Sequence, residues 1–231
     1  MKRADAQIVD SYRRLFAAHG YAPQSLGWDK GKQFLRFHQL TSTFELTGAS
    51  LLDVGCGFGD FVGYLRALNI EDCAYVGIDL VDEFIAEGEK RFGSPNATFV
   101  RSALEDYGPT SPFDYVIASG TFNLKLEGVD GYEEIRRSLA RMFSLSKVAL
   151  SADFLSDKVD YGHEHNFRSA PETILKMAYE LSRNVVLRND YFPFEFCLTI
   201  YKDDSFSRDT TTFGTTEDRL SSLKLQGPRG R

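Results

Sequence analysis

The chain has 231 residues, of which 42% are hydrophobic and 26% charged, as is typical of one globular domain with a sizeable core. Its formal net charge of −6 argues against a non-specific nucleic-acid binder, which normally carries a basic excess, so we expect no nucleic-acid partner. The three cysteines, Cys56, Cys73 and Cys197, stand far apart without metal-ligand spacing. The sequence therefore predicts neither a resident metal nor a disulfide framework.

The N-terminal residues lack the apolar core of a signal peptide. No apolar run approaches the roughly 20 residues that a membrane-spanning helix needs. We therefore expect a cytoplasmic protein without a membrane partner, and the sequence leaves its oligomeric state open.

Hydrophobic spacing predicts two N-terminal helices, at about 4–19 and 31–47. We expect residues 1–48, which contain both helices, to form a helical lid that belongs to the same domain. Strands and helices then alternate through a core at 49–202. The expected strands are 51–54, 74–78, 98–100, 115–118, 147–152, 185–187 and 196–201. This order predicts an α/β fold: a three-layer αβα sandwich with a mostly parallel seven-stranded sheet that ends in an antiparallel hairpin. Residues 203–231 are polar, and we expect them to form a flexible tail.

A glycine-rich turn follows the first expected strand, in the segment Leu51–Gly59. Such turns let the backbone approach a ligand, and the next helix presents free N–H groups to it. The spacing here is Gly55-x-Gly57-x-Gly59, whereas a dinucleotide site requires a glycine at the position of Asp60. Asp53, at the end of the strand, would also repel a pyrophosphate. Both features oppose a nicotinamide-dependent oxidoreductase.

From this phrase onward, residues 50–202 resemble the class I S-adenosylmethionine (SAM)-dependent methyltransferases. The resemblance implies SAM as the cofactor and S-adenosylhomocysteine (SAH) as its product. Asp79 would accept hydrogen bonds from the ribose hydroxyls, Leu80 would pack on adenine, and Arg36 would pair with the methionine carboxylate. The complete set of cofactor-binding residues that we predict is Arg36, Asp53, Gly55, Cys56, Gly57, Asp79, Leu80, Ala103, Leu104 and Ser119.

The sequence departs from the family pattern at Ala103, and it also lacks a motif that is typical of one substrate group. Many relatives carry an aspartate where Ala103 stands, so the adenine edge would be read here by backbone groups. The loop after the fourth strand carries Ser119 and Asn123 but lacks the Asn-Pro-Pro-Tyr phrase of many adenine or glutamine amino-methylating enzymes. The resemblance implies that Asn123 faces the methyl acceptor.

The segment 153–166, which follows the fifth expected strand, is rich in titratable groups and includes His163 and His165. The carboxyl end of a strand in an open α/β sheet faces the ligand cleft, and an imidazole is a suitable general base. Either histidine is thus a candidate to remove the acceptor's proton. Two other interpretations stay open: both are exposed loop residues, or their His-x-His spacing holds a metal.

These patterns predict methyl transfer from SAM to a small-molecule acceptor, to a hydroxyl or acidic oxygen in preference to nitrogen. The aromatic block 185–196 resembles methyltransferases of bacterial surface-polysaccharide and natural-product pathways. Two alternatives remain, a small-molecule N-methyltransferase and a catalytically silent SAM-binding accessory protein. The second remains because SAM binding and turnover use different residues.

Overall fold

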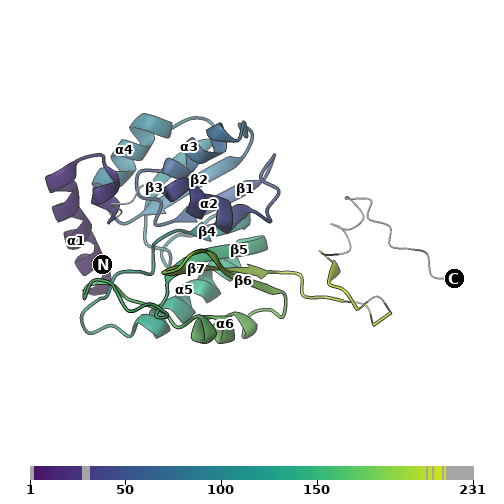
Figure 1. Ribbon diagram of the computed structural model, residues 1–231. Coiled ribbons are helices and arrows are strands. Elements are labelled where there is room, and N and C mark those ends of the chain that lie inside the picture. Colours follow the sequence, from purple (N-terminus) through teal and green to yellow (C-terminus); the bar gives the residue numbers. More distant parts are fainter. Residues whose placement is uncertain (1–2, 28–31, 207, 210, 215, 217–231) are drawn as a thin grey trace.

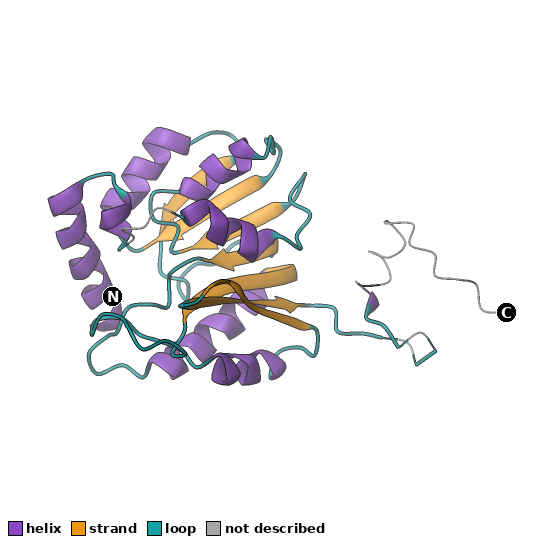
Figure 2. Ribbon diagram, viewed as in Figure 1, coloured by secondary structure: helices purple, strands orange, loops and turns teal. Residues whose placement is uncertain are grey.

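The computed structural model describes residues 3–27, 32–206, 208–209, 211–214 and 216. A seven-stranded sheet with strand order β3-β2-β1-β4-β5-β7-β6 forms its centre (Figures 1 and 2). The strands are β1 (Ser50–Val54), β2 (Ala74–Asp79), β3 (Ala97–Arg101), β4 (Phe113–Ala118), β5 (Ser146–Leu155), β6 (Val185–Phe192) and β7 (Glu195–Tyr201). β1 to β5 pair in parallel, whereas β7 runs antiparallel to both of its neighbours. The predicted mostly parallel sheet closed by a hairpin is confirmed.

Helices cover both faces of this sheet, which makes the predicted three layers (Figure 1). The helices are α1 (Arg3–His19), α2 (Gln33–Thr41), α3 (Asp60–Ala67), α4 (Asp82–Phe92), α5 (Gly131–Leu145) and α6 (Pro171–Tyr179), with a short 3₁₀ helix η1 (Pro23–Leu26). Their starts follow local chemistry. The Asp130 side chain accepts hydrogen bonds from the Tyr132 and Glu133 amides at the start of α5, and Pro171 occupies the first turn of α6.

Three elements differ in length from the expectation. Helix α2 ends at Thr41 instead of near residue 47, because a run of β-branched and hydroxyl residues follows and the Thr41 hydroxyl donates to the Phe37 carbonyl. Strand β5 extends to Leu155, so Asp153 belongs to a strand and not to the loop after it. Strand β6 extends to Phe192, beyond the expected residue 187, through an irregularity in its pairing with β7.

Helix α1 (Figure 1) packs against the start of α4 and the loop after β1, and its contacts there are between aromatic side chains. The ring of Tyr12 meets Phe84 at 5.9 Å, and Phe16 meets Phe58 at 5.8 Å. Arg13 pairs with Asp82 at 3.1 Å at the surface. Helix α1 is therefore held against the core by these contacts, and its role as a lid stays a prediction.

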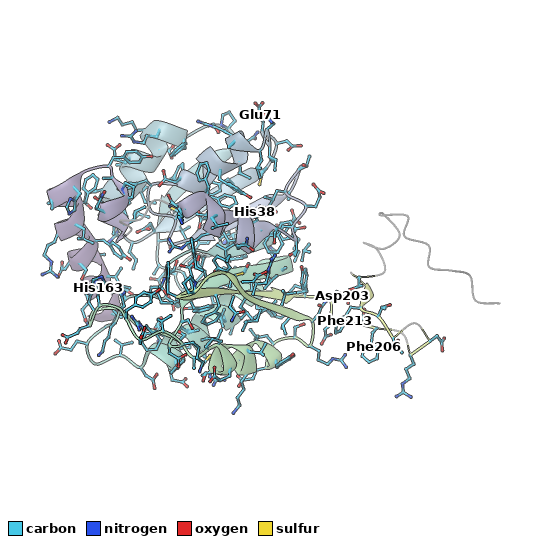
Figure 3. All side chains as sticks on the ribbon, in the orientation of Figure 1. His38, Glu71, His163, Asp203, Phe206 and Phe213 are labelled. Atoms are coloured by element: carbon cyan, nitrogen blue, oxygen red, sulfur yellow. The ribbon has the colours of Figure 1, made fainter. Side chains whose placement is uncertain are left out.

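The described part of the segment after Tyr201 extends from the side of the molecule opposite His163 (Figure 3). Asp204 is paired with Arg183 at 3.1 Å, and the Asp203 carbonyl accepts a hydrogen bond from Asn184. Residues 217–231, and hence most of the predicted flexible tail, lie outside the described residues. Among the described residues, no helix has the length and apolarity to span a membrane.

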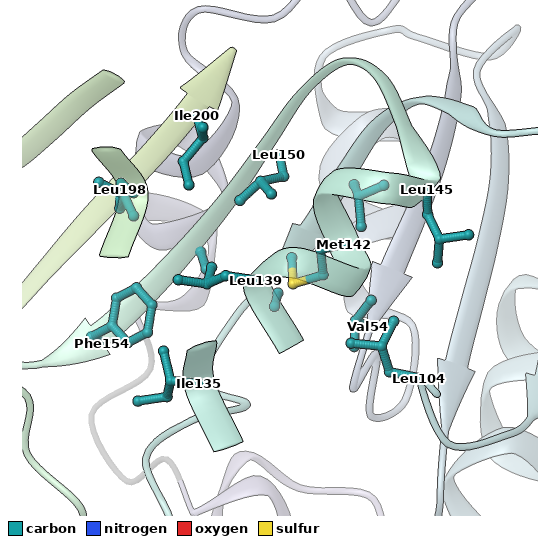
Figure 4. Close-up of a cluster of buried hydrophobic side chains, with 14 of the residues drawn as sticks. Val54, Leu104, Ile135, Leu139, Met142, Leu145, Leu150, Phe154, Leu198 and Ile200 are labelled. Carbon is teal, nitrogen blue, oxygen red and sulfur yellow. The ribbon is translucent and has the colours of Figure 1, made fainter. Parts of the chain in front are cut away.

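The core lies on both sides of the sheet because side chains of a strand alternate between its faces. Leu52 and Val116 point towards α5 and α6, whereas Leu51 and Ile117 point towards α2 and α3. Figure 4 shows the first of these clusters, in which Ile135, Leu139, Met142 and Leu145 of α5 meet Leu150, Phe154, Leu198 and Ile200 of the sheet. Both faces of the inner strands are thus packed against apolar side chains. This packing holds the carboxyl ends of the strands in place, where a binding site can form.

Candidate active site

A cavity of about 280 Å³ lies at the carboxyl ends of β1, β2 and β4. Nine of the ten residues predicted to bind the cofactor line it: Asp53, Gly55, Cys56, Gly57, Asp79, Leu80, Ala103, Leu104 and Ser119. Its carboxylates are Asp5, Asp53, Asp79, Glu105 and Glu134, and Lys125 is the single lysine or arginine in this lining among the described residues. We call it the acidic cavity.

The glycine turn forms the floor of the acidic cavity, and its shape requires glycine. Gly55 and Gly59 have φ angles of 70° and 74°, in the left-handed region. A Cβ on Gly55 would come within 2.7 Å of the Thr121 hydroxyl, and one on Gly59 within 2.2 Å of the Phe99 ring. The Gly55 and Cys56 amides donate to the Ile78 carbonyl, which ties the turn to β2. The backbone therefore forms one wall of the cavity.

Asp79 joins the glycine turn to the start of α4. Its carboxylate accepts hydrogen bonds from the Gly57 and Val81 amides, each at 2.9 Å. Burial raises the pKa of Asp79 to about 6, although these backbone hydrogen bonds act in the opposite direction. Each carboxylate oxygen has a second lone pair, so this structural role leaves room for ligand hydroxyls.

Asp53 is a fully buried carboxylate of the acidic cavity, only 3% exposed. The Tyr75 hydroxyl donates to it at 2.9 Å. Burial raises the pKa of Asp53 to about 7, and the nearby carboxylates Asp79 and Asp153 add to that rise. A cationic ligand would favour the charged form and offset the cost of burying it. Burial also raises the pKa of the Cys56 thiol, so this cysteine is an inert wall residue.

A second cavity, of about 590 Å³, is lined by Lys32, Arg36, Arg168, His163 and His165 together with aromatic and aliphatic side chains. Its lining contains no Asp or Glu among the described residues. We call it the basic cavity. Tyr12, Leu26, Gly120 and Leu124 line both cavities. The two spaces therefore adjoin across a shared wall contributed by α1, η1 and the loop after β4.

Arg36 lies in the lining of the basic cavity and not of the acidic one. It is 5% exposed, and its Nε donates to Glu195 Oε2 at 2.6 Å. Its guanidinium also lies over the Phe192 ring, 5.6 Å from the centroid. The predicted role for Arg36, pairing with the methionine carboxylate, thus stays a prediction, while the structure gives it a protein carboxylate partner.

Asp153, at the end of β5, holds the loop that follows β4. Its carboxylate accepts from the Ser119 hydroxyl at 2.8 Å and from the Gly120 amide at 2.6 Å. Burial raises the pKa of Asp153, and the nearby Arg36 guanidinium opposes this effect. Burial and the Asp153 charge together raise the pKa of Glu195 to about 8. One buried cation thus faces two buried carboxylates, an arrangement that favours a proton on one of the two.

The predicted catalytic residues all line the basic cavity. His163, labelled in Figure 3, and His165 are exposed, and their rings stack with centroids 5.3 Å apart. Asn123 accepts a hydrogen bond from the Leu155 amide at 2.9 Å, and its amide nitrogen is buried without a partner among the described residues. No group of three or more His, Cys, Asp or Glu in the described part of the chain could hold a metal.

Comparison with known proteins places this architecture in a family. Residues 51–142 match the family model described as a methyltransferase domain. A Mycobacterium tuberculosis protein named as a methyltransferase is 29% identical over 159 residues, which are 66% of this chain and 93% of that relative. The family match and these similarities support a SAM-dependent methyltransferase of class I.

Two further relatives of this methyltransferase are informative. The phthiotriol/phenolphthiotriol dimycocerosates methyltransferase of M. tuberculosis is 31% identical over 106 residues, which cover 46% of this chain but only 37% of that protein. The SAM-bound magnesium protoporphyrin IX methyltransferase of Synechocystis is 16% identical with a TM-score of 0.59, over 87% of this chain and 98% of that one. At that identity the second similarity supports the fold alone.

Sequence reasoning missed three residues that the methyltransferase fold brings to the two cavities. Tyr12 lines both cavities, and burial together with the Asp79 charge raises its pKa to about 12. Asp153 and Glu195 stand next to them as buried carboxylates. Tyr12 was visible only as one apolar position of a helix. For Asp153 and Glu195, the sequence offered one signal, an acidic residue inside an apolar run, as at Glu195 between Phe194 and Phe196.

Proposed function

We propose that this methyltransferase binds SAM in the acidic cavity and transfers its methyl group to an oxygen of a small molecule held in the basic cavity. We place the reaction in a natural-product or saccharide pathway. The observation that carries the proposal is the adjoining position of the two cavities, which share Tyr12, Leu26, Gly120 and Leu124. A donor and an acceptor in these spaces would meet at that shared wall.

The residues of the acidic cavity fit SAM better than a dinucleotide. SAM carries a sulfonium cation, whose methyl group the acceptor displaces in line. The carboxylates of buried Asp53 and partly buried Asp79 favour a positively charged ligand, and they would repel a pyrophosphate. In our proposal Asp79 holds the ribose hydroxyls, Leu80 and the backbone at Ala103 and Leu104 contact adenine, and Ser119 offers its backbone to the cofactor.

The residues of the basic cavity would orient the acceptor and take up its proton. His163 or His165 accepts the proton of an acceptor hydroxyl, while the oxygen forms its bond to the methyl carbon and the sulfur keeps the electron pair of the broken bond. Asn123 has a buried amide nitrogen without a partner, and a hydrogen bond to the acceptor would satisfy it. The lack of carboxylates in this described lining disfavours a cationic amine as acceptor.

Calorimetry with the purified protein tests the cofactor half of the proposal. We expect SAM and SAH to bind and NADH not to bind. Asp79→Ala should weaken SAH binding by about 1–3 kcal/mol, because buried donors lose their partner. Asp106→Ala removes an exposed aspartate outside both cavity linings and should leave the affinity unchanged. Binding of NADH without binding of SAM or SAH would overturn the assignment.

A second assay tests turnover. Release of SAH in the presence of candidate hydroxylated, carboxylated and amine compounds should occur with the oxygen acceptors. SAH release with amines alone would establish N-methylation instead. A protein that binds SAM tightly and releases no SAH with any acceptor would be a silent accessory subunit.

A further inference from the structure

The basic cavity has a composition that the net charge of the chain does not suggest. The protein carries a formal charge of −6, yet this cavity is lined by three cationic side chains and no described carboxylate. Arg36 is compensated by Glu195. Lys32 and Arg168 have no carboxylate partner among the residues that the structure describes. Two uncompensated cations therefore face one ligand-sized space.

Arg168 is held in place by the loop that carries the histidines. Its Nη1 donates to the Val159 carbonyl at 3.3 Å, and its guanidinium lies against Gly162, where a Cβ would come within 1.2 Å of Nη2. It is half-buried, whereas Lys32 is exposed. A fixed, partly buried guanidinium is well suited to bind carboxylate or phosphate oxygens.

An aromatic wall lies beside these cations. The rings of Phe192 and Phe194 stack with centroids 5.1 Å apart, and Tyr161 meets Phe194 edge-on at 6.5 Å. Lys32 Nζ lies 5.9 Å from the centroid of Phe192, so one cation and the wall are adjacent. Tyr161 is 50% exposed, which leaves apolar surface available to a ligand. Flat aromatic surfaces of this kind stack on rings.

We propose that the methyl acceptor is an anion with a flat, ring-containing body, whose carboxylate, phosphate or sulfonate group is bound by Lys32 and Arg168 and whose ring packs on Phe192, Phe194 and Tyr161. The proposal rests on the proposed function, because it names the substrate class of the same site. The anionic group serves for recognition. The methyl-accepting oxygen is a separate hydroxyl, since the histidines line this cavity too.

A matched pair of fluorescent probes separates charge from shape. 8-Anilinonaphthalene-1-sulfonate and N-phenyl-1-naphthylamine share the same ring system and differ in the sulfonate. We expect the anionic probe to bind more tightly than the neutral one, with and without saturating SAH, and to weaken as salt is added. Equal affinities, or no binding of the anionic probe, would overturn the proposal.

Substitutions of single cationic residues show which of them bind the anionic group of the probe. Lys32→Gln should weaken the anionic probe about two- to fivefold, as for an exposed ion pair, and Arg168→Gln about tenfold, as for a charged hydrogen bond. Lys176→Gln removes the same charge from an exposed position of α6 and should have no effect. The neutral probe should change less than about twofold in all three variants. Equal losses in the Lys176 and Lys32 variants would contradict the assignment.

The outcome stays separable from the cofactor proposal. Calorimetry with SAH on each variant checks both its folding and its acidic cavity. Intact SAH binding with no preference for the anionic probe would reject the acceptor class alone. A clear anionic preference without SAH binding would reject the cofactor assignment and keep the anion site.

Discussion

The two cavities adjoin and share four wall residues, yet they carry opposite charge. The acidic cavity contains five carboxylates and the basic cavity three lysine or arginine side chains. Arg36, which lines the basic cavity, is buried together with Glu195 and Asp153, and Asp153 also holds the loop that borders both spaces. Charges interact strongly in the low-dielectric interior of a protein, so the acidic cavity attracts a cation and the basic cavity attracts an anion. The contrast suggests that the protein selects its two ligands largely by charge.

The largest expected effect concerns the histidines of the basic cavity. Substitution by alanine of whichever histidine, His163 or His165, is the general base should lower kcat by about 10²–10⁴-fold. SAM affinity should change little, since neither residue lines the acidic cavity. The measurement is SAH release at saturating SAM with an acceptor found in the turnover assay, and His19→Ala on α1 is the control.

Nearly full kcat in both single variants would show that proximity and desolvation suffice and that these are ordinary loop histidines. Recovery of a lost rate by added divalent metal would favour the metal interpretation.

The next effect concerns the buried ion pair of Arg36 and Glu195 at the basic cavity. Glu195→Ala removes the hydrogen-bonded partner of the buried Arg36 guanidinium and should destabilise the fold by about 1–3 kcal/mol in urea unfolding, because Asp153 still faces that cation. Glu172→Ala breaks the exposed pair with Lys158 and should cost less than about 1 kcal/mol. Joint replacement by Arg36→Met and Glu195→Leu should restore much of the loss. Equal costs for the buried and the exposed pair would contradict the role of burial.

A smaller effect tests the acidic cavity through pH. Asp53 and Asp79 have pKa values raised to about 7 and about 6, so both become charged between pH 5.5 and 8. SAM has a positive sulfur that SAH lacks, and charged carboxylates bind it better. The ratio of SAM to SAH affinity should therefore rise with pH, by about 3–10-fold if the sulfonium lowers one carboxyl pKa by half to one unit.

Asp53→Asn should reduce this pH dependence to the part that Asp79 contributes, because the amide keeps the Tyr75 hydrogen bond and cannot ionise. Asp72→Asn removes an exposed carboxylate away from both cavities and should leave the dependence intact. A flat ratio in the unaltered protein would argue against electrostatic selection of the cofactor.

The smallest effect is expected at the C-terminus. Deletion of residues 207–231 should change SAH affinity by less than about twofold, because no cavity-lining residue in the described chain lies beyond Phe194. Calorimetry on the truncated protein provides the measurement. A large loss of affinity would assign a binding role to the segment.

The sequence by itself determined the fold and indicated nine of the residues that line the acidic cavity. Alternating strands and helices, the glycine turn at Gly55–Gly59 and the acidic residue Asp79 are local patterns, and the carboxyl ends of neighbouring parallel strands always meet at one edge. The lengths of two elements differ from the prediction. Helix α2 ends early because hydroxyl residues follow Phe37, and strand β5 continues through a buried carboxylate, Asp153, that resembles a loop residue in the sequence.

Only the tertiary structure decided the charge of the basic cavity and the partner of Arg36. Arg36 and Glu195 lie 159 residues apart, and no spacing along the chain indicates that they meet. Lys32, Arg168 and the Phe192–Phe194 wall come from three separate segments that meet only in the folded chain. Charge pairing acts through space, so whether a cation is compensated or available to a ligand follows from its neighbours in the fold.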